Sequence, residues 1–196
     1  MPDKLGLVQV YTGNGKGKTS ASLGLSLRAV GQGFSVYIVQ FLKSGDTGEL
    51  FSIKKYVPNI KIAQFGKEAL QDKQLKMFEF DGTGELNGAG GTYFFPPAEE
   101  EREPCRRALE HASTVINSGD YNIVVLDEIN NAMSRGIVDV QDVLKLIENK
   151  PAEVELILTG RNAPQEIIAR ADLVSDIHEV KHPWVKGVSA RRGIEY

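Results

Sequence analysis

A glycine-rich turn between a strand and a helix constrains the fold of this chain more than any other feature of its sequence. The apolar run 5–11 predicts a strand, residues 18–30 predict a helix, and between them stands Thr12-Gly13-Asn14-Gly15-Lys16-Gly17-Lys18-Thr19. Glycine lets a backbone turn tightly and approach a ligand closely. The N–H groups at a helix N-terminus bind phosphate oxygens. The turn therefore predicts a phosphate loop, and its eight residues are candidate ligands of the ATP phosphates.

Two residues at the end of this loop suit a triphosphate with its metal ion. Lys18 would supply a point charge to the phosphates, and the hydroxyl of Thr19 would bind Mg²⁺. The general pattern G-x-x-x-x-G-K-[ST] places glycine where this chain has Thr12, and counted from Gly13 the loop is one residue short. The alternative is a glycine-rich turn that binds nothing. The coincidence of strand, glycines, Lys-Thr and helix favours the phosphate loop.

Apolar runs alternate with helical patterns along the rest of the chain. Strands are predicted at residues 36–41, 60–65, 123–126, 154–159 and 173–178, and helices at 98–118, 138–149 and 163–171. Because Pro104 suits only a first helical turn, we expect the regular part of its helix to begin near Glu103. The alternation predicts an α/β fold. We expect a single RecA-like, P-loop NTPase-like domain over residues 1–196, with a mostly parallel sheet and helices on both faces.

Composition excludes several other classes of protein. A chain of 196 residues fits one domain, and its net charge of −3 gives no support for a nucleic-acid or polybasic membrane surface. One cysteine allows no intramolecular disulfide. The start lacks the apolar region of a secretory signal, and no apolar run approaches the roughly 18–20 residues of a membrane span. We therefore expect a cytoplasmic protein with no nucleic-acid or membrane partner.

Charged residues follow two of the predicted strands. Asp127 and Glu128 end the apolar run 123–126, at the place where P-loop proteins hold their metal ion. Arg161 follows the run 154–159 and can neutralise phosphate charge. Ligands of parallel sheets bind beyond the carboxyl ends of the strands, which makes Asp127 and Glu128 metal ligands and Arg161 a catalytic candidate. The alternatives are a helix N-cap for the two acids and a surface position for the arginine.

A glycine-rich, aromatic segment interrupts the alternation at residues 81–97. Five glycines stand between Asp81 and Gly91, and Tyr93, Phe94 and Phe95 follow. Such a stretch resists regular structure, so it predicts a mobile loop. Its aromatic residues would suit a lid over a flat ligand. A surface loop pinned to the core by the same aromatics is the alternative.

The ordered set of motifs resembles the P-loop type of corrinoid adenosyltransferase, also called ATP:cob(I)alamin or cob(I)yrinic acid a,c-diamide adenosyltransferase. The resemblance runs along most of the chain and includes the shortened loop. The other matching segments are Arg28-Ala29-Val30-Gly31, Val39-Gln40-Phe41-Leu42-Lys43, Val124-Val125-Leu126-Asp127-Glu128, Leu158-Thr159-Gly160-Arg161, Val180-Lys181-His182 and the end from Gly187 to Tyr196.

The resemblance implies a reaction that spacing alone could not show. Members bind ATP with Mg²⁺ or Mn²⁺ and present the ribose C5′ to the Co(I) of a reduced corrinoid, so that triphosphate leaves. Lys18, Arg161 and the loop N–H groups would stabilise the leaving charge. Gln40 and Phe41 would join Tyr93, Phe94 and Phe95 as corrinoid contacts. The resemblance also implies a homodimer and a flavoprotein reductant as partner.

One segment departs from the family pattern. Well-known members carry Gly-Phe-Thr-Trp-Glu-Thr before the helix that corresponds to residues 98–118, and its aromatics displace the lower ligand of cobalt. This chain has Gly91-Thr92-Tyr93-Phe94-Phe95-Pro96-Pro97 there, which is not a residue-by-residue match. The preferred corrinoid therefore stays open. Two other functions also stay open: a P-loop small-molecule kinase or ATPase, and a nucleotide-dependent binding module without turnover.

Overall fold

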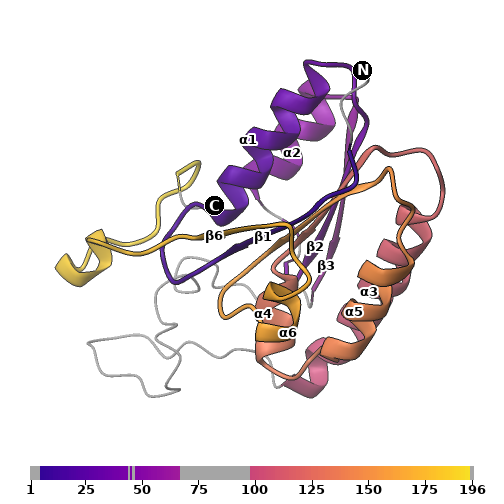
Figure 1. The fold of residues 1–196 in the computed structure, drawn as a ribbon. Coiled ribbons are helices and arrows are strands. Elements are labelled where there is room, and N and C mark those ends of the chain that lie inside the picture. The colour runs from indigo at the N-terminus through magenta and orange to yellow at the C-terminus, as the bar shows by residue number, and fades with distance from the viewer. Residues whose placement is uncertain (1–4, 44, 46, 67–97, 195–196) are drawn as a thin grey trace.

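A six-stranded parallel sheet forms the centre of the molecule (Figure 1). The computed structural model describes residues 5–43, 45, 47–66 and 98–194. The strands lie in the order β3-β2-β4-β5-β1-β6, and each neighbouring pair is parallel. Their bounds are β1 Val8–Thr12, β2 Val36–Phe41, β3 Ile60–Phe65, β4 Ile123–Asp127, β5 Glu155–Thr159 and β6 Leu173–Asp176. The predicted parallel α/β fold is confirmed.

Helices cover both faces of the sheet, as expected. Figure 1 shows α1 and α2 on one face and α3 to α6 on the other. Their bounds are α1 Lys18–Val30, α2 Gly48–Tyr56, α3 Ala98–Ile116, α4 Ile129–Ser134, α5 Val140–Asn149 and α6 Gln165–Ile168, and a 3-10 helix η2 spans Pro183–Lys186. Among the described residues, no helix is long and apolar enough to cross a membrane.

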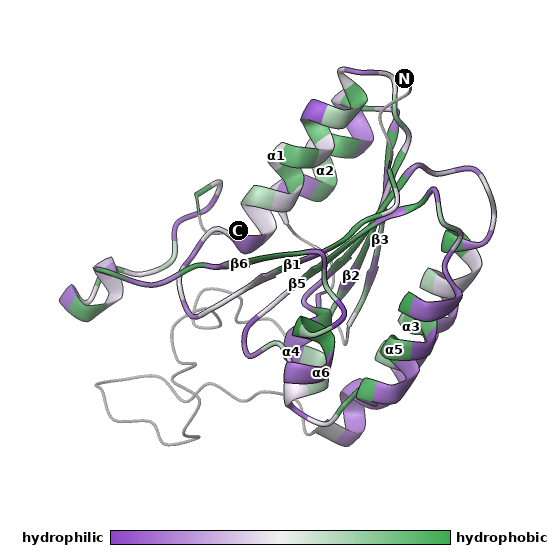
Figure 2. Cartoon of the chain, viewed as in Figure 1, coloured by the Kyte–Doolittle hydropathy of each residue, from purple (hydrophilic) through white to green (hydrophobic). Residues whose placement is uncertain are grey.

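Alternating side chains of the central strands build two hydrophobic cores. Along β4, Val124 and Leu126 pack with α3 to α6, whereas Ile123 and Val125 pack with α1 and α2. All five residues of β4 are buried, as are all five of β5. Residues 123–126 of β4 and 156–158 of β5 are accordingly all apolar (Figure 2), because each face of a parallel sheet is covered by helices.

Three helical features differ from the sequence-based expectations. The helices α2 and α4 were not predicted, since α2 buries only Ile53 and α4 has six residues. The expectation that α3 becomes regular near Glu103 is wrong, because Pro104 lies inside the helix, which begins at Ala98. Burial of Cys105, Ala108 and Ala112 against the sheet holds this helix in place. Tertiary packing thus outweighs the cost of a proline.

The strand order brings the predicted site together at one edge of the sheet. Strand β5 lies between β1, which leads into the phosphate loop, and β4, which ends at Asp127. Strand β2 flanks β4 on the other side, and Gln40 is in register with Asp127. Because all of these strands point the same way, their carboxyl ends meet at this edge.

Candidate active site

The phosphate loop joins β1 to the first turn of α1. Gly17 is the N-cap residue of α1 and has a φ of 119°, a left-handed conformation that favours glycine. The first intrahelical bond runs from Ala21 N–H to the Gly17 carbonyl. The N–H groups of residues 18–20 precede that bond, so this end of the helix can donate to an anion.

The chain that follows β6 packs directly against the phosphate loop. Gly15 N–H donates to the Ile177 carbonyl at 2.7 Å, and Glu179 N–H donates to Asn14 Oδ1 at 3.1 Å. A Cβ on Gly13 would lie 2.4 Å from the Ile177 carbonyl oxygen, and one on Gly15 would lie 2.7 Å from the His178 carbonyl carbon. Residues 176–179 therefore require glycine at both positions, independently of any phosphate.

Two further loop residues contact other parts of the chain. Thr12 is buried, and its hydroxyl accepts a hydrogen bond from Ala163 N–H at 3.1 Å. The exposed Lys16 donates to the Ile194 carbonyl at 3.1 Å. These contacts fix the loop against the segments after β5 and β6.

Lys18 folds back over its own loop. Its Nζ donates to the carbonyl oxygens of Gly13 at 2.6 Å and of Gly15 at 2.7 Å. Burial lowers the pKa of Lys18, and Arg161 adds to that effect against the attraction of Glu128. Since both contacts are with neutral oxygens, the ammonium gains by meeting a phosphate.

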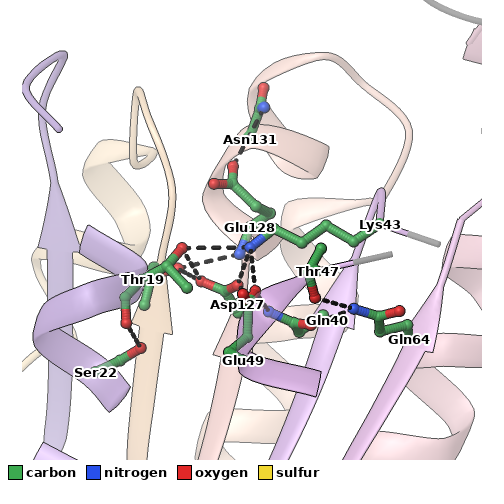
Figure 3. Close-up of polar contacts among 11 residues, drawn as sticks. Thr19, Ser22, Gln40, Lys43, Thr47, Glu49, Gln64, Asp127, Glu128 and Asn131 are labelled. Carbon is green, nitrogen blue, oxygen red and sulfur yellow. Dashed lines mark hydrogen bonds and ion pairs between the residues drawn. The ribbon is translucent and has the colours of Figure 1, made fainter. Parts of the chain in front are cut away.

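Asp127, the last residue of β4, is the centre of a polar cluster formed with residues of α1, β5, β2 and the turn after β2 (Figure 3). Its Oδ1 accepts hydrogen bonds from the hydroxyls of Thr19 at 2.9 Å and Thr159 at 2.6 Å. Its Oδ2 accepts from Gln40 Nε2 at 2.9 Å and Lys43 Nζ at 2.8 Å. We call these five residues the Asp127 network. Four donors use the full capacity of a carboxylate.

The charge on Asp127 is stabilised although no part of its side chain is exposed. Burial alone would raise the pKa of Asp127, but Lys43 and the hydrogen bonds outweigh it and lower the pKa. For Lys43, burial opposes the charge, and Asp127, Glu128 and Glu49 together raise its pKa. The two residues therefore form an ion pair at neutral pH.

Buried amides extend the Asp127 network towards β3. Gln40 also donates to Glu49 Oε1 at 3.0 Å and accepts from Gln64 Nε2 at 2.8 Å. Gln64 in turn donates to the hydroxyl of Thr47 at 2.9 Å (Figure 3). These bonds fix the side chain of Gln40, which is 0% exposed, and so fix one of the donors to Asp127.

Glu128 differs from its neighbour in its surroundings. It is the N-cap residue of α4 and has a left-handed φ of 67°, but its side chain caps no helical N–H. Within the described part of the chain, its carboxylate accepts one hydrogen bond, from Asn131 Nδ2 at 3.4 Å. Burial and the nearby Asp127 raise the pKa of Glu128. A strained, weakly bonded carboxylate at this edge suits a ligand-binding role.

A tight turn after β5 brings Arg161 to the same edge. Gly160 has a φ of 131°, and a Cβ there would lie 2.7 Å from Asn131 N. Gly160 N–H donates to the Tyr11 carbonyl at 3.2 Å. The turn therefore lies against the start of the phosphate loop, and Arg161 is near enough to influence the pKa of Lys18.

The oxygen atoms at this edge fit a hard divalent cation. Magnesium is usually held by one or two carboxylates and a hydroxyl, with substrate phosphates and water completing its shell. Thr19, Asp127 and Glu128 supply that set. The described residues hold no cluster of three or more His, Cys, Asp or Glu side chains that could bind a metal ion. Substrate phosphates and water would complete the shell of a cation held by these residues.

Comparison with known proteins identifies the family of the chain. Residues 4–196 match the model of the family described as ATP:corrinoid adenosyltransferase BtuR/CobO/CobP. The chain belongs to the ATP:corrinoid adenosyltransferase family.

Curated members of this family are similar over nearly their full length. The corrinoid adenosyltransferase of Escherichia coli (strain K12) is 31% identical over 99% of this chain and 87% of its own length. The one from Sinorhizobium sp is 32% identical over 99% of this chain and 82% of its own length. Among solved structures, a KaiC-like protein from Pyrococcus horikoshii OT3 is 20% identical, with a TM-score of 0.43, over 90% of this chain and 75% of that protein.

The structure brings together most of the residues that the sequence singled out. Lys18, Thr19, Asp127, Glu128 and Arg161 lie at one edge of the sheet. Tyr93, Phe94 and Phe95, with the rest of the loop 81–97, lie outside the described residues.

The two expected corrinoid contacts on β2 are buried. Phe41 is 0% exposed within the hydrophobic core, and Gln40 belongs to the Asp127 network. Direct contact between a corrinoid and either side chain would require this part of the edge to open.

Sequence reasoning missed three contributors to the site. It named Lys43 within a segment that matches the family but did not pair it with Asp127. It gave no role to the Thr159 hydroxyl or to residues 176–179. A polar residue that ends a buried strand was the available signal for Thr159. Local pattern gave no signal for the contact between residues 176–179 and the loop.

Proposed function

We propose that this chain transfers the 5′-deoxyadenosyl group of ATP to the Co(I) centre of a reduced corrinoid, in the synthesis or salvage of adenosylcobalamin. One observation carries the assignment of the site: the phosphate loop and the Asp127 network meet through the Thr19–Asp127 hydrogen bond of 2.9 Å. Family membership supplies the reaction.

The reaction needs positioning and charge stabilisation rather than a general base. The electron pair of Co(I) forms the Co–C5′ bond, the C5′–O bond breaks, and its electrons leave on the triphosphate. Because cobalt is the nucleophile, no proton has to be removed from it. The protein must hold C5′ in line with cobalt and stabilise the negative leaving group.

Lys18 and Arg161 are suited to stabilise that leaving group. Nucleotide would draw the Lys18 ammonium from the carbonyls of Gly13 and Gly15 to a phosphate, which replaces two neutral partners by a charged one. Burial lowers the pKa of Lys18. A phosphate beside its ammonium group would therefore stabilise the charged form. Arg161 adds a second cation, and the N–H groups at the start of α1 add donors.

A divalent cation would complete the charge balance of the triphosphate. When bound, Mg²⁺ or Mn²⁺ supplies Lewis-acid stabilisation of the phosphate oxygens. Thr19 and Glu128 are the direct ligands that we propose. Asp127 already accepts four hydrogen bonds, so we assign it the task of orienting Thr19 and acting on the ion through water.

Three finer features belong to the same proposal. The aromatic residues Tyr93, Phe94 and Phe95 would contact the corrinoid, a reduced flavoprotein would supply the electron for Co(II), and the active form would be a homodimer. The resemblance to the family implies the reductant and the dimer, whereas the aromatic residues are proposed from their place before α3, since they do not match the family motif. Sedimentation of the purified protein tests the dimer.

Product analysis tests the function directly. The protein is incubated anaerobically with ATP, Mg²⁺, a strong chemical reductant and either cobalamin or cobyrinic acid a,c-diamide. We expect an adenosylated corrinoid and one equivalent of inorganic triphosphate. The relative rates with the two corrinoids identify the preferred acceptor.

Other products would contradict the proposal. ADP as the sole nucleotide product would indicate a kinase or an ATPase. Bound, unchanged ATP in the presence of reduced corrinoid would indicate a binding module.

A further inference from the structure

Lys43 places a cation among the groups that should hold the metal ion. Its Nζ lies 2.8 Å from Asp127 Oδ2, 3.5 Å from Thr19 Oγ1 and 3.6 Å from Glu49 Oε1 (Figure 3). An ammonium group in these contacts neutralises the buried Asp127, which would otherwise be costly to keep charged. The site therefore contains one cation of the protein itself.

We propose that Lys43 occupies the cation position of the nucleotide-free protein and makes metal binding conditional on the triphosphate. This inference rests on the metal site proposed above. In the absence of nucleotide, Lys43 repels a divalent ion from Thr19 and Asp127. In its presence, the ammonium turns to the phosphates and the metal takes its place.

The distance between Lys43 Nζ and Thr19 Oγ1 means that the ammonium group would compete with a metal ion bound to Thr19. A magnesium ion about 2.1 Å from Thr19 Oγ1 could lie no farther than about 6 Å from Lys43 Nζ, since Nζ is 3.5 Å from that oxygen. At such a separation a unit charge and a double charge repel strongly at the edge of a protein. The metal alone brings no negative charge to offset this repulsion. A triphosphate brings about four negative charges with it.

The side chain of Lys43 is placed to make this exchange. It extends from the turn just after β2, follows Leu42 with its left-handed φ of 58°, and is 24% exposed, whereas Asp127 is fully buried. A flexible side chain at the solvent boundary can move, and the carboxylate beneath it cannot. Asp127 would keep a cation nearby throughout, first the ammonium and then the metal ion.

Manganese binding to the full chain tests the inference without using activity. Free Mn²⁺ is counted by electron paramagnetic resonance in titrations of wild type, Lys43→Gln, Lys43→Met and Lys43→Arg. Each titration is run without nucleotide, with inorganic triphosphate and with ATP. Gln keeps a donor for Asp127 while removing the charge, and Arg keeps the charge. Circular dichroism melts verify that each variant is folded.

We expect wild type and Lys43→Arg to bind Mn²⁺ tightly only with triphosphate or ATP. Lys43→Gln and Lys43→Met should gain nucleotide-free Mn²⁺ affinity of roughly tenfold or more, because the repelling charge is gone. The control Lys145→Ala removes the same charge and an ion pair with Asp142 at a surface remote from the site. Its Mn²⁺ binding should equal that of wild type.

Two results overturn the inference and remain distinguishable. If the folded neutral variants still require triphosphate for tight Mn²⁺ binding, Lys43 does not impose the condition, and the metal site itself stands. If wild type binds no Mn²⁺ beyond that of free ATP, and Thr19→Val changes nothing, the proposed metal site fails and this inference fails with it.

Discussion

The phosphate loop and the Asp127 network use their lysines in opposite ways. In the loop, Lys18 contacts two neutral carbonyl oxygens, and burial lowers its pKa. In the network, Lys43 contacts a buried carboxylate, and the surrounding acids raise its pKa. Lys18 thus contacts neutral oxygens, whereas Lys43 contacts a negatively charged carboxylate.

This difference between the two lysines indicates that the phosphate loop suits an anion and that the Asp127 network suits a cation. In the proposed complex, a triphosphate would bring its negative charge to Lys18 and its metal ion to Thr19 and the acids beside it. Thr19 links the two regions, because its hydroxyl donates to Asp127 and accepts from Lys43. Four substitutions, taken from the largest expected effect to the smallest, test this division.

Removing the charge of Lys18 should produce the largest effect. Lys18→Ala is expected to lower the rate of adenosylation by roughly 10²–10³-fold or more, because a preorganised cation for the leaving triphosphate is lost. Product formation under single-turnover conditions measures it. Lys18→Arg keeps the charge and should retain more activity than Lys18→Ala. A wild-type rate for Lys18→Ala would remove Lys18 from the site.

Breaking the ion pair of the network should affect stability rather than phosphate binding alone. Asp127→Asn removes the closer of the two carboxylates that contact Lys43, the other being Glu49, and should lower the free energy of unfolding by about 2–4 kcal/mol, since Asp127 is fully buried and Lys43 partly exposed. Urea unfolding measures the change. The matched exposed pair is lost in Asp142→Asn, which should cost no more than about 0.5 kcal/mol.

The loss of stability in Asp127→Asn should depend on pH in a defined way. The pKa of Asp127 is lowered below its ordinary value of 3.8 in the folded state. Its stabilising contribution is therefore complete above that value and is lost as the pH falls through the lowered pKa. The difference between wild type and Asp127→Asn should be constant near neutral pH and shrink in acid. A difference that grows in acid would contradict the ion pair.

Adding a methyl group at Gly15 tests why the phosphate loop needs glycine at this position. Gly15→Ala would place a Cβ 2.7 Å from the His178 carbonyl carbon, so it should destabilise the nucleotide-free protein by about 1–3 kcal/mol. Gly24→Ala in α1 meets nothing within 4 Å and should stabilise by up to about 1 kcal/mol. Urea unfolding without ATP compares them. An unchanged stability of Gly15→Ala would leave the phosphate as the sole reason for glycine.

Neutralising Glu128 should give the smallest change in stability, in the opposite direction. Burial and Asp127 raise the pKa of Glu128 above its ordinary value of 4.5, so the charged form weakens the fold at neutral pH. Glu128→Gln should therefore be slightly more stable than wild type at pH 7. This advantage should fade as the pH falls through the raised pKa of Glu128, and it should be absent below 4.5, where Glu128 is protonated in the folded and the unfolded state.

The rate of adenosylation is the second measurement on Glu128→Gln. The rate of adenosylation by Glu128→Gln should fall at least tenfold, because a direct metal ligand is lost. A variant that is more stable and less active marks a functional carboxylate. A loss of stability at pH 7 would instead assign Glu128 a structural role.

Much of the fold followed from local pattern. The bounds of α1, β2 and β3 agree with the predicted ranges, because glycine, apolar runs and helical spacing mark them clearly. The helix α3 continued through Pro104 because its far side is buried against the sheet. The helices α2 and α4 were missed because short segments with few buried residues leave a weak periodic signal.

Sequence by itself determined that this chain has a phosphate loop, a strand ending in two acids and the ordered motifs of one family, because each is a local run of residue types. Only the tertiary structure decided that Lys43 pairs with Asp127 and that residues 176–179 pack against Gly13 and Gly15. It also decided that the Asp127 carboxylate accepts four hydrogen bonds, whereas the Glu128 carboxylate accepts one within the described residues. The physical reason is distance along the chain. The Lys43–Asp127 contact joins positions 84 residues apart and the Glu179–Asn14 contact joins positions 165 residues apart, so folding alone brings them within hydrogen-bonding range.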